Sequence, residues 1–255
     1  MFTPSGLIGS WVALGLAMGS FASVLVARIP ERLGIHGKSQ CLSCKREISF
    51  YDNIPLLGYI RLRGKCRWCK SSISPIYPLL ELFTALATIY LVMSFNSWIL
   101  CTAWIIFLTV GLSLTVIDVR SHRLPNVLTL PLYLILCSVL VLDSIVNSMW
   151  SSFFRALFLS AALCFFYLLL NIISKGGMGL GDAKFALSVG LLAGYVSGFT
   201  VIGATFVAFF LGALVGVIAM LAKKGNRKTA IPFGPFIFLG TLLAPWLSPL
   251  LLQLL

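Results

Sequence analysis

Residues 82–118 read LFTALATIYLVMSFNSWILCTAWIIFLTVGLSLTVID, and this stretch decides the fold. Its first 36 residues carry no charge, and Asp118 then closes the run. A helix that crosses a membrane needs about 20 mostly apolar residues. The stretch is therefore long enough for two such helices, and the polar segment at 94–97 predicts the turn between them.

Uncharged runs also fill most of the remaining chain. The run at 185–222 accommodates two helices, with a predicted turn near 195–198, and four shorter runs accommodate one helix each: 2–27, 124–142, 156–174 and 229–255. With 59% hydrophobic and 10% charged residues, the chain is unlike soluble domains. We expect an all-α polytopic membrane protein with about eight transmembrane helices. The sixth, near 184–194, is short and rich in glycine, so we expect it to tilt or to insert only in part.

The positions of Lys and Arg predict the orientation of these helices. If the loop after the first helix is cytoplasmic, 18 of the 19 basic residues lie on that side, ten of them between 28 and 70, and only Arg155 lies opposite. Cytoplasmic loops carry such an excess, and both termini then face away from the cytoplasm. Topology thus explains the net charge of +12, and nucleic acid is not an expected partner. The run at 2–27 has no basic region before it and no small-x-small cleavage site, so we expect it to be a retained span.

Two aspartates, Asp118 and Asp182, are the main candidates for chemistry. They are two of only seven acidic residues, and the predicted topology places both at cytoplasmic helix ends. An ionisable side chain at a membrane boundary is a candidate functional residue, and a pair of carboxylates that share a proton is the apparatus of aspartic proteolysis. The alternative is that each aspartate ends a helix near water, Asp118 beside Arg120 or Arg123 and Asp182 beside Lys184.

Four further residues are candidates to support this pair. Gly179 and Gly181 precede Asp182 in the sequence Gly-Leu-Gly-Asp, and the absence of side chains there would let a substrate strand approach the backbone. Lys184 either favours ionisation of a carboxylate or anchors the helix end at the interface. Glu81, which opens the second helix on the same side, either orients substrate or stabilises the start of the helix.

Four cysteines in the polar segment at 28–77 predict a metal site. Cys41 and Cys44 form one C-x-x-C pair, Cys66 and Cys69 form another, and 21 residues separate the pairs. Two such pairs are typical of zinc ribbons, and four thiolates saturate one tetrahedral zinc, which makes the site structural. The alternative is two disulfides, which are rare in the reducing compartment that the predicted topology assigns to this loop.

The motifs, taken in order along nearly the whole chain, resemble the type IV prepilin peptidases, which are membrane aspartic proteases of the Gly-x-Gly-Asp class. Seven segments carry the resemblance: Gly19-Ser20-Phe21 with Arg28-Ile29-Pro30-Glu31, the paired C-x-x-C motifs, 52–57, 77–82, Asp118 with Leu124-Pro125-Asn126, 179–184, and Pro232-Phe233-Gly234-Pro235. Leu42 departs from the pattern, because relatives often have proline after the first cysteine, but the thiolates are unaffected.

The resemblance implies an endopeptidase of the bacterial inner membrane. Its substrates would be prepilins or pseudopilins in the lipid bilayer, whose short basic leader is cut after a glycine at the cytoplasmic face. The cysteine loop resembles that of bifunctional members, which N-methylate the new N-terminal residue with S-adenosylmethionine, although no residue of this chain indicates where that cofactor binds. We expect a first transmembrane helix at 1–27, a zinc-binding methyltransferase loop at 28–77, and a peptidase domain at 78–255.

Other activities and the basis of substrate recognition stay open at the level of sequence. The rivals are another Gly-x-Gly-Asp protease of the membrane, against which the cysteine loop argues, and a transporter that relays protons or cations through its carboxylates. Carboxylates at one membrane face rather than near the midplane weaken the second rival. A basic cytoplasmic face does not attract a basic leader, so Glu47, Asp52 and Glu81 are the candidate acids for leader recognition.

Overall fold

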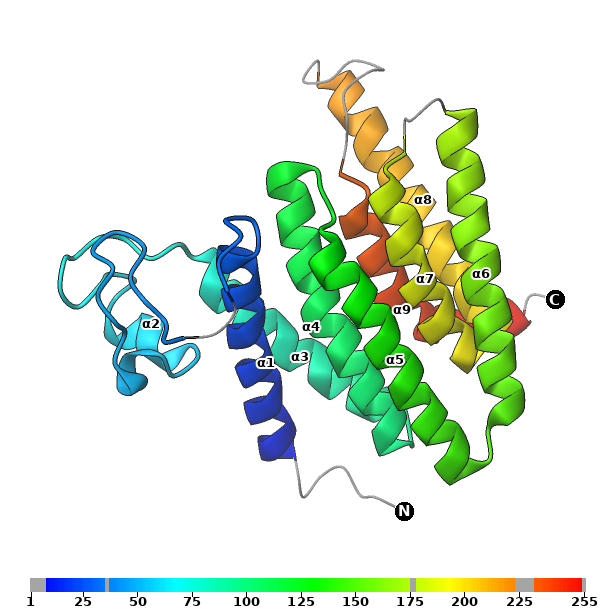
Figure 1. The fold of residues 1–255 in the computed structure, drawn as a ribbon, viewed down its shortest axis with the longest axis horizontal. Coiled ribbons are helices and arrows are strands. Elements are labelled where there is room, and N and C mark those ends of the chain that lie inside the picture. Colours follow the sequence, from blue (N-terminus) through cyan, green and yellow to red (C-terminus); the bar gives the residue numbers. More distant parts are fainter. Residues whose placement is uncertain (1–7, 35–36, 175–177, 223–231, 254–255) are drawn as a thin grey trace. The chain divides into compact units, whose positions relative to one another are not determined.

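The computed structural model describes residues 8–34, 37–174, 178–222 and 232–253, and its regular structure over these ranges is helical (Figure 1). Two short helices, η2 (Phe50–Asp52) and α2 (Leu57–Arg61), lie in the cysteine loop. Eight long helices make up the rest of the described regular structure: α1 (Ile8–Arg28), α3 (Ile76–Ser94), α4 (Trp98–Ser121), α5 (Asn126–Asn147), α6 (Trp150–Ile173), α7 (Leu180–Val196), α8 (Gly198–Leu221) and α9 (Gly234–Gln253).

These eight helices correspond in order to the eight predicted from the uncharged runs, so the predicted all-α membrane architecture is confirmed. Six of them are long and apolar enough to cross a membrane. Of the other two, α7 has only 17 residues, and α9 is apolar over Gly234–Leu247, the part of this helix whose side chains are described. Both predicted turns lie where expected, and each ends at a serine, Ser97 or Ser197, whose hydroxyl accepts an N–H of the following helix. Such side-chain caps satisfy helix-terminal amides.

The predicted boundaries differ from the observed ones at several helix ends, and the starts of α7 and α6 matter most here. Helix α7 begins at Leu180, before the expected 184–194 segment, so Asp182 belongs to its first turn. Helix α6 begins at Trp150, six residues before the expected run at 156–174, because a polar residue at a helix end does not stop the helix. Five of the basic residues used to predict the orientation lie outside the described residues: Lys175, Lys223, Lys224, Arg227 and Lys228.

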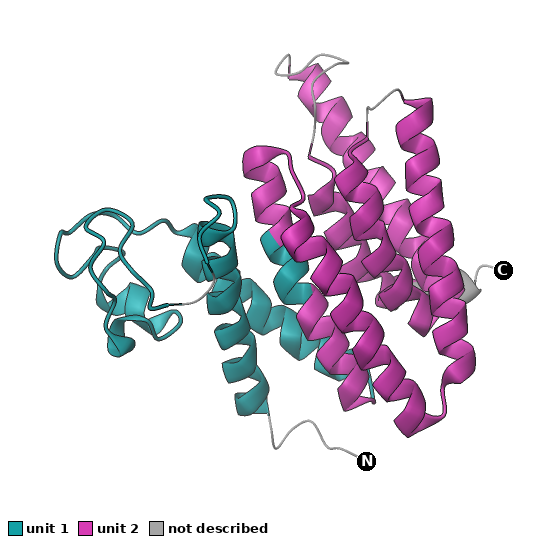
Figure 2. Cartoon of the chain, in the orientation of Figure 1, with its two compact units in different colours: residues 1–96, 108–113 teal, residues 97–107, 114–255 magenta. Residues whose placement is uncertain are grey.

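The described chain divides into two compact units, one of residues 1–96 with 108–113 and one of residues 97–107 with 114–255 (Figure 2). In the first unit, α1 packs closely against α3. A Cβ atom on Gly15 would lie 2.6 Å from the Cα of Ala85, and one on Gly19 would lie 2.5 Å from the Cα of Glu81. Small residues permit such close helix contacts in membranes. There, burying an apolar side chain against another helix gains no hydrophobic free energy over contact with lipid.

In the second unit, α7 contacts α5, α6, α8 and α9. A Cβ on Gly190 would lie 2.6 Å from the Cα of Ser160 in α6, and the hydroxyl of Ser160 donates to the carbonyl of Leu187 at 2.8 Å. The ring of Phe185 in α7 stacks on that of Phe107 in α4, with centroids 5.6 Å apart. The 17-residue helix is therefore held by other helices over most of its surface.

A buried polar cluster around Asp143 joins three helices of the second unit. The Asp143 carboxylate accepts hydrogen bonds from Ser97 at 2.5 Å, Asn147 at 2.8 Å and the Tyr195 hydroxyl at 2.7 Å. Nearby, Arg155 of α6 donates to the carbonyls that end α7, including that of Tyr195 at 2.8 Å. Ser97 caps the start of α4, and Tyr195 lies in the last turn of α7. The cluster therefore joins the end of α4 opposite Asp118 to the end of α7 opposite Asp182.

We expect Tyr195→Phe to destabilise the protein, because it removes a donor from a buried carboxylate. A lost hydrogen bond to a charged group costs about 1.5–3 kcal/mol of unfolding free energy in typical cases. The measurement is the thermal unfolding midpoint in detergent. Tyr133→Phe in α5 is the control, since the Tyr133 hydroxyl makes no hydrogen bond within the described residues, and equal midpoints for the two variants would contradict the expectation.

Candidate active site and metal centre

Asp118 lies in the last turn of α4, with its side chain 5% exposed. The helix ends at His122, whose φ of 50° is left-handed and whose N–H donates to the carbonyl of Asp118 at 2.7 Å. The carboxylate accepts a hydrogen bond from the backbone N–H of Gly234 at 2.9 Å. Gly234 is the first residue of α9, so its free amide and the positive end of that helix dipole lie at Asp118, which favours negative charge there.

Asp182 lies in the first turn of α7 and is 7% exposed. Its carboxylate accepts the backbone N–H of Gly179 at 3.1 Å, while its own N–H donates to the carbonyl of Gly179 at 3.1 Å. This return bond from the third helical residue to the capping residue is one half of a capping box. Asp182 is therefore held at the N-terminal end of its own helix, as Asp118 is held at the N-terminal end of α9.

The two carboxylates, 64 positions apart in the chain, interact electrostatically across the second unit. The predicted basic partners are not engaged with them: no ion pair joins either aspartate to Arg120, Arg123 or Lys184 within the described residues. Both aspartates are thus buried, each carboxylate accepts one backbone amide, and the two are close enough for their charges to interact. The role of the pair in catalysis stays a prediction.

The supporting candidates near Asp182 have clear contacts. A Cβ on Gly181 would lie 2.9 Å from the Cβ of Leu124, so glycine lets the start of α7 pack against the segment that follows α4. Lys184 donates to the side-chain oxygen of Asn126 at 2.9 Å. Both contacts join the chain just after Asp118 to the helix that carries Asp182. They position the two aspartates relative to each other.

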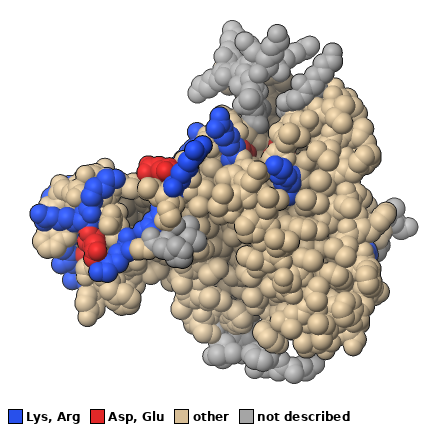
Figure 3. All heavy atoms as spheres, viewed as in Figure 1, with Lys and Arg blue, Asp and Glu red and all other residues tan. Residues whose placement is uncertain are grey.

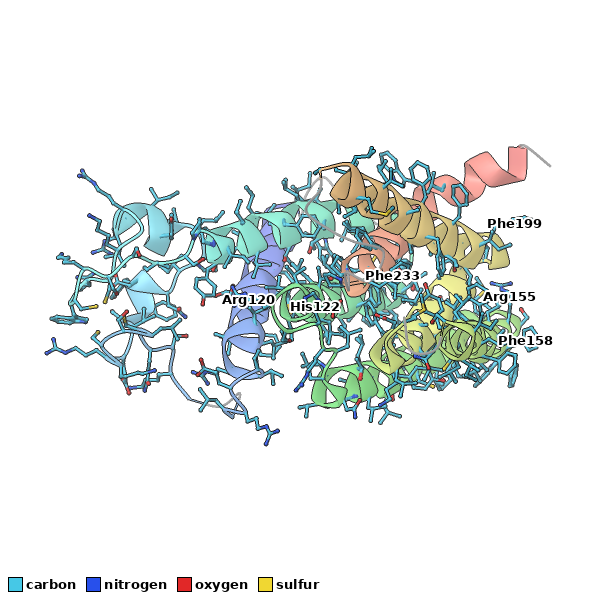
Figure 4. The ribbon with its side chains drawn as sticks, turned by 90° about the horizontal axis from the view of Figure 1, so that it is seen from above. Arg120, His122, Arg155, Phe158, Phe199 and Phe233 are labelled. Carbon is cyan, nitrogen blue, oxygen red and sulfur yellow. The ribbon has the colours of Figure 1, made fainter. Side chains whose placement is uncertain are left out.

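Sequence reasoning missed two residues near the pair. Gly234 belongs to a motif that was noted without a role, and its amide is the partner of Asp118. Tyr167 in α6 is 2% exposed, interacts electrostatically with Asp182, and packs its ring 6.3 Å from that of Phe233. A tyrosine inside an apolar run carries no signal of its own. Figure 4 labels Phe233, next to Gly234, close to His122 at the end of α4.

Glu81 belongs to the first compact unit, whereas both aspartates belong to the second. It is 9% exposed, and its carboxylate accepts the backbone N–H of Leu56 at 2.8 Å. The Ser20 side chain of α1 also hydrogen-bonds to it. Glu81 therefore joins the cysteine loop to the contact between α1 and α3.

The four loop cysteines form a group that could hold a metal ion, with all four sulfur atoms within 4.8 Å of one another. All are free thiols. The sulfur atoms of Cys41 and Cys69 are 3.8 Å apart, close to the roughly 3.8 Å that tetrahedral geometry requires at a Zn–S distance of about 2.3 Å. Backbone hydrogen bonding at Cys44 lowers the pKa of the Cys41 thiol to about 6, which favours the thiolate that binds metals.

The two C-x-x-C turns have the same backbone structure, 25 positions apart. In the first turn, the N–H of Cys41 donates to the carbonyl of Arg46 at 3.0 Å, and the N–H of Lys45 donates to the carbonyl of Cys41 at 2.9 Å. In the second turn, the N–H of Cys66 donates to the carbonyl of Ser71 at 2.9 Å, and the N–H of Lys70 donates to the carbonyl of Cys66 at 3.1 Å. An isolated β-bridge closes each turn. Two equivalent turns present their thiols to one point, as the spacing predicted.

Lys and Arg side chains gather over this loop on the face shown in Figure 3. Two of its three acids form ion pairs with them. Glu47 meets Lys38 at 2.7 Å, and Asp52 accepts two bonds from Arg67, at 2.6 and 2.5 Å. The Arg67 guanidinium holds the pKa of Asp52 below its usual value. The loop is thus basic overall, with these two carboxylates already neutralised.

Two family models match the chain in succession. The one described as the bacterial peptidase A24 N-terminal domain matches residues 13–95, and the one described as the type IV leader peptidase family matches residues 104–217. The first contains the cysteine loop and Glu81, and the second contains Asp118 and Asp182. No solved structure matches the chain.

Several curated proteins called prepilin leader peptidase/N-methyltransferase are similar to the chain. The protein of Pseudomonas aeruginosa is 32% identical over 264 residues, which cover 92% of this chain and 88% of the relative. That of Stutzerimonas stutzeri is 32% identical over 89% of this chain and 86% of the relative, and that of Vibrio cholerae is 31% identical over 89% and 91%. With such identity over nearly the full length of its relatives, the chain belongs to the type IV leader peptidase family.

Proposed function

We propose that this protein is a membrane aspartic peptidase that removes the leader of prepilins or pseudopilins after a glycine and then N-methylates the new N-terminal residue. The pairing of Asp118 with Asp182 carries the proposal. The protein has only seven acidic residues, and two of them, buried in helices that are far apart in the sequence, interact electrostatically. The names of the relatives, which join both activities, support the same conclusion.

The pair would act as one unit that holds a single proton. The ionised carboxylate takes a proton from a water molecule as the water oxygen attacks the peptide carbonyl carbon. The protonated carboxyl donates a hydrogen bond to the carbonyl oxygen, where negative charge develops. The tetrahedral intermediate then collapses, the C–N bond breaks, and the leaving nitrogen takes the proton that the first carboxylate had removed from water.

The backbone amides of Gly234 and Gly179 would orient this pair. Each donates to one oxygen of one aspartate, at 2.9 and 3.1 Å, and leaves the second oxygen of that carboxylate for water or substrate. Amide donors need no reorganisation during the reaction. Tyr167 and the aromatic ring of Phe233 would close the site on the side of α6.

Cys41, Cys44, Cys66 and Cys69 would hold one zinc ion, which supplies a structural cross-link and takes no part in peptide hydrolysis. A polar loop of this size needs such a cross-link to fold. S-adenosylmethionine would be the methyl donor when bound, and the described residues assign it no site. We also propose the domain division at 1–27, 28–77 and 78–255, in which the loop serves methyl transfer.

The proposed location is the bacterial inner membrane. Six helices of the described part of the chain are long and apolar enough to cross a membrane. The basic residues support a cytoplasmic position for the loop and the aspartates, with both termini on the opposite side. The relay transporter is not favoured, because the relatives are named as peptidases. The same names argue against the other Gly-x-Gly-Asp proteases.

Incubation of the purified full-length protein with a prepilin and S-adenosylmethionine tests both activities together. Mass spectrometry of the product should find a new N-terminus after the leader glycine, carrying one added methyl group. An unmethylated new N-terminus would restrict the proposal to the peptidase, and an intact prepilin would overturn it.

We expect Gly234→Ala to slow cleavage about a hundred-fold, the effect that a displacement of about 1 Å can have. The added Cβ would lie 2.8 Å from the bound oxygen of Asp118, so the carboxylate or the start of α9 must move. Gly198→Ala at the start of α8 is the matched control, since a Cβ there meets nothing within 4 Å. Similar rates of leader release for both variants would contradict this role of Gly234.

A further inference from the structure

Six of the seven acidic residues have an evident environment that accounts for their charge. Asp118 and Asp182 form the proposed catalytic pair, and Asp143 accepts hydrogen bonds from three side chains. Glu47 and Asp52 form ion pairs with basic residues, and Glu31 is exposed to solvent. The seventh is Glu81. It is the acid that remains to be explained.

Glu81 is a buried carboxylate without a cation. It is 9% exposed, and no ion pair joins it to a basic residue within the described ranges. Its partners are the N–H of Leu56 and the side chain of Ser20. A carboxylate can accept about four hydrogen bonds, and a buried one is costly to keep ionised unless a cation accompanies it. Glu81 therefore has the capacity for a further, positively charged partner, which would stabilise its ionised form.

The loop is held in an unusual conformation where it meets Glu81. Leu56 has a φ of 59° and a ψ of −50°, and the N–H of Leu57 donates to the carbonyl of Pro55 in a three-residue turn. A branched side chain rarely adopts a left-handed φ, and this kind of three-residue turn is strained. The N–H of Leu56, at the centre of this turn, is the group that donates to Glu81. The carboxylate thus lies at a built junction between the loop and the contact of α1 with α3.

We propose that Glu81 binds a cationic nitrogen of the substrate, an alkylammonium or a guanidinium. The proposal rests on the proposed function, because that function supplies two such groups. One is a Lys or Arg side chain of the basic leader. The other is the α-ammonium group that cleavage of the peptide bond releases. Of the three acids that the sequence offered for leader recognition, Glu47 and Asp52 are already paired, which leaves Glu81.

Glu81→Gln separates charge from structure, because its side-chain oxygen can still accept the N–H of Leu56. Full-length wild type and variant are compared in kcat and KM for cleavage of a prepilin, and of the same prepilin with its leader Lys and Arg changed to Gln. If the leader is the ligand, the variant raises KM about ten-fold with the native leader, in line with the strength of charged hydrogen bonds. The neutral leader abolishes the difference.

The second arm measures methyl transfer to a prepilin that has already lost its leader. If the α-ammonium is the ligand, Glu81→Gln leaves cleavage unchanged and raises the KM of this pre-cleaved substrate about ten-fold. Glu47→Gln is the control, since its partner Lys38 is exposed, and it should leave both reactions within two-fold of wild type. Values for Glu81→Gln within two-fold in both arms would overturn the proposal.

Glu81→Asp keeps the negative charge on a shorter side chain. It replaces Glu81→Gln in both arms of the test if the thermal unfolding midpoint shows that the Gln variant does not fold. Recognition of a cation predicts that the Asp variant still distinguishes native from neutral leader, or still methylates the pre-cleaved substrate. A carboxylate that only holds Leu56 predicts no such distinction. Failure of the proposed function has another signature, because the wild-type protein would then leave every prepilin uncut.

Discussion

Replacing either aspartate of the pair by asparagine should abolish leader cleavage, with a loss of at least about a thousand-fold in kcat. Asparagine has nearly the shape of aspartate and keeps an oxygen for the amide of Gly234 or Gly179, so the fold should persist. It can neither take a proton from water nor donate a carboxyl proton, and a positioned acid or base contributes about 10²–10⁴-fold to a rate. The measurement is the rate of leader release by purified Asp118→Asn and Asp182→Asn.

Asp143→Asn is the matched control for this prediction. Asp143 is as buried as the pair, with 2% exposure, and lies in the cluster that joins Ser97 to Tyr195. The variant should lower the unfolding midpoint and still release the leader. Methyl transfer to a pre-cleaved substrate should survive in all three variants. Retained cleavage in both Asp118→Asn and Asp182→Asn would exclude the pair as the catalytic group.

Replacing a loop cysteine should release the metal and unfold the loop. Binding of a structural zinc contributes about 10–16 kcal/mol to the folding of small zinc domains, and three thiolates do not saturate a tetrahedral ion. For Cys66→Ser, which removes the most buried of the four thiols, we expect the zinc content to fall from about one ion per chain to a small fraction. Methyl transfer should suffer more directly than leader cleavage.

Cys137→Ser in α5 is the control, because Cys137 is a free thiol outside the metal-binding group. It should keep both the metal and both activities. Zinc content is measured by elemental analysis of the purified protein, and the loop by its resistance to limited proteolysis. Equal and complete loss of both activities in a well-folded Cys66→Ser protein would assign the loop to the peptidase site itself.

The helices and the metal-binding turns are predictable because their signals are local. An uncharged run of 36 residues has room for two spans whatever surrounds it, and the observed turn between α3 and α4 lies at the polar segment 94–97. Each C-x-x-C turn is closed by hydrogen bonds within six residues of its first cysteine. The spacing of the two pairs was therefore sufficient to predict that four thiols meet.

The beginning of α7 was less predictable. Glycines at 179 and 181 argue against a helix by propensity, yet the helix starts at Leu180 because Asp182 caps it and Leu124 packs against Gly181. Packing and a side-chain cap outweigh a local preference there.

The sequence by itself determined the membrane class, the order of the helices, the paired cysteines and the two candidate aspartates, since each depends on composition or short spacing. Tertiary structure alone decided the partners: Gly234 reaches Asp118 from 116 positions away, and Glu81 meets Leu56 of the loop and no cation. The physical reason is that an apolar helix surface gains little free energy by contacting another helix instead of lipid, and its residue pattern does not specify which helix packs against it. Which helix ends meet, and which amide faces which carboxylate, follows only from the packed fold.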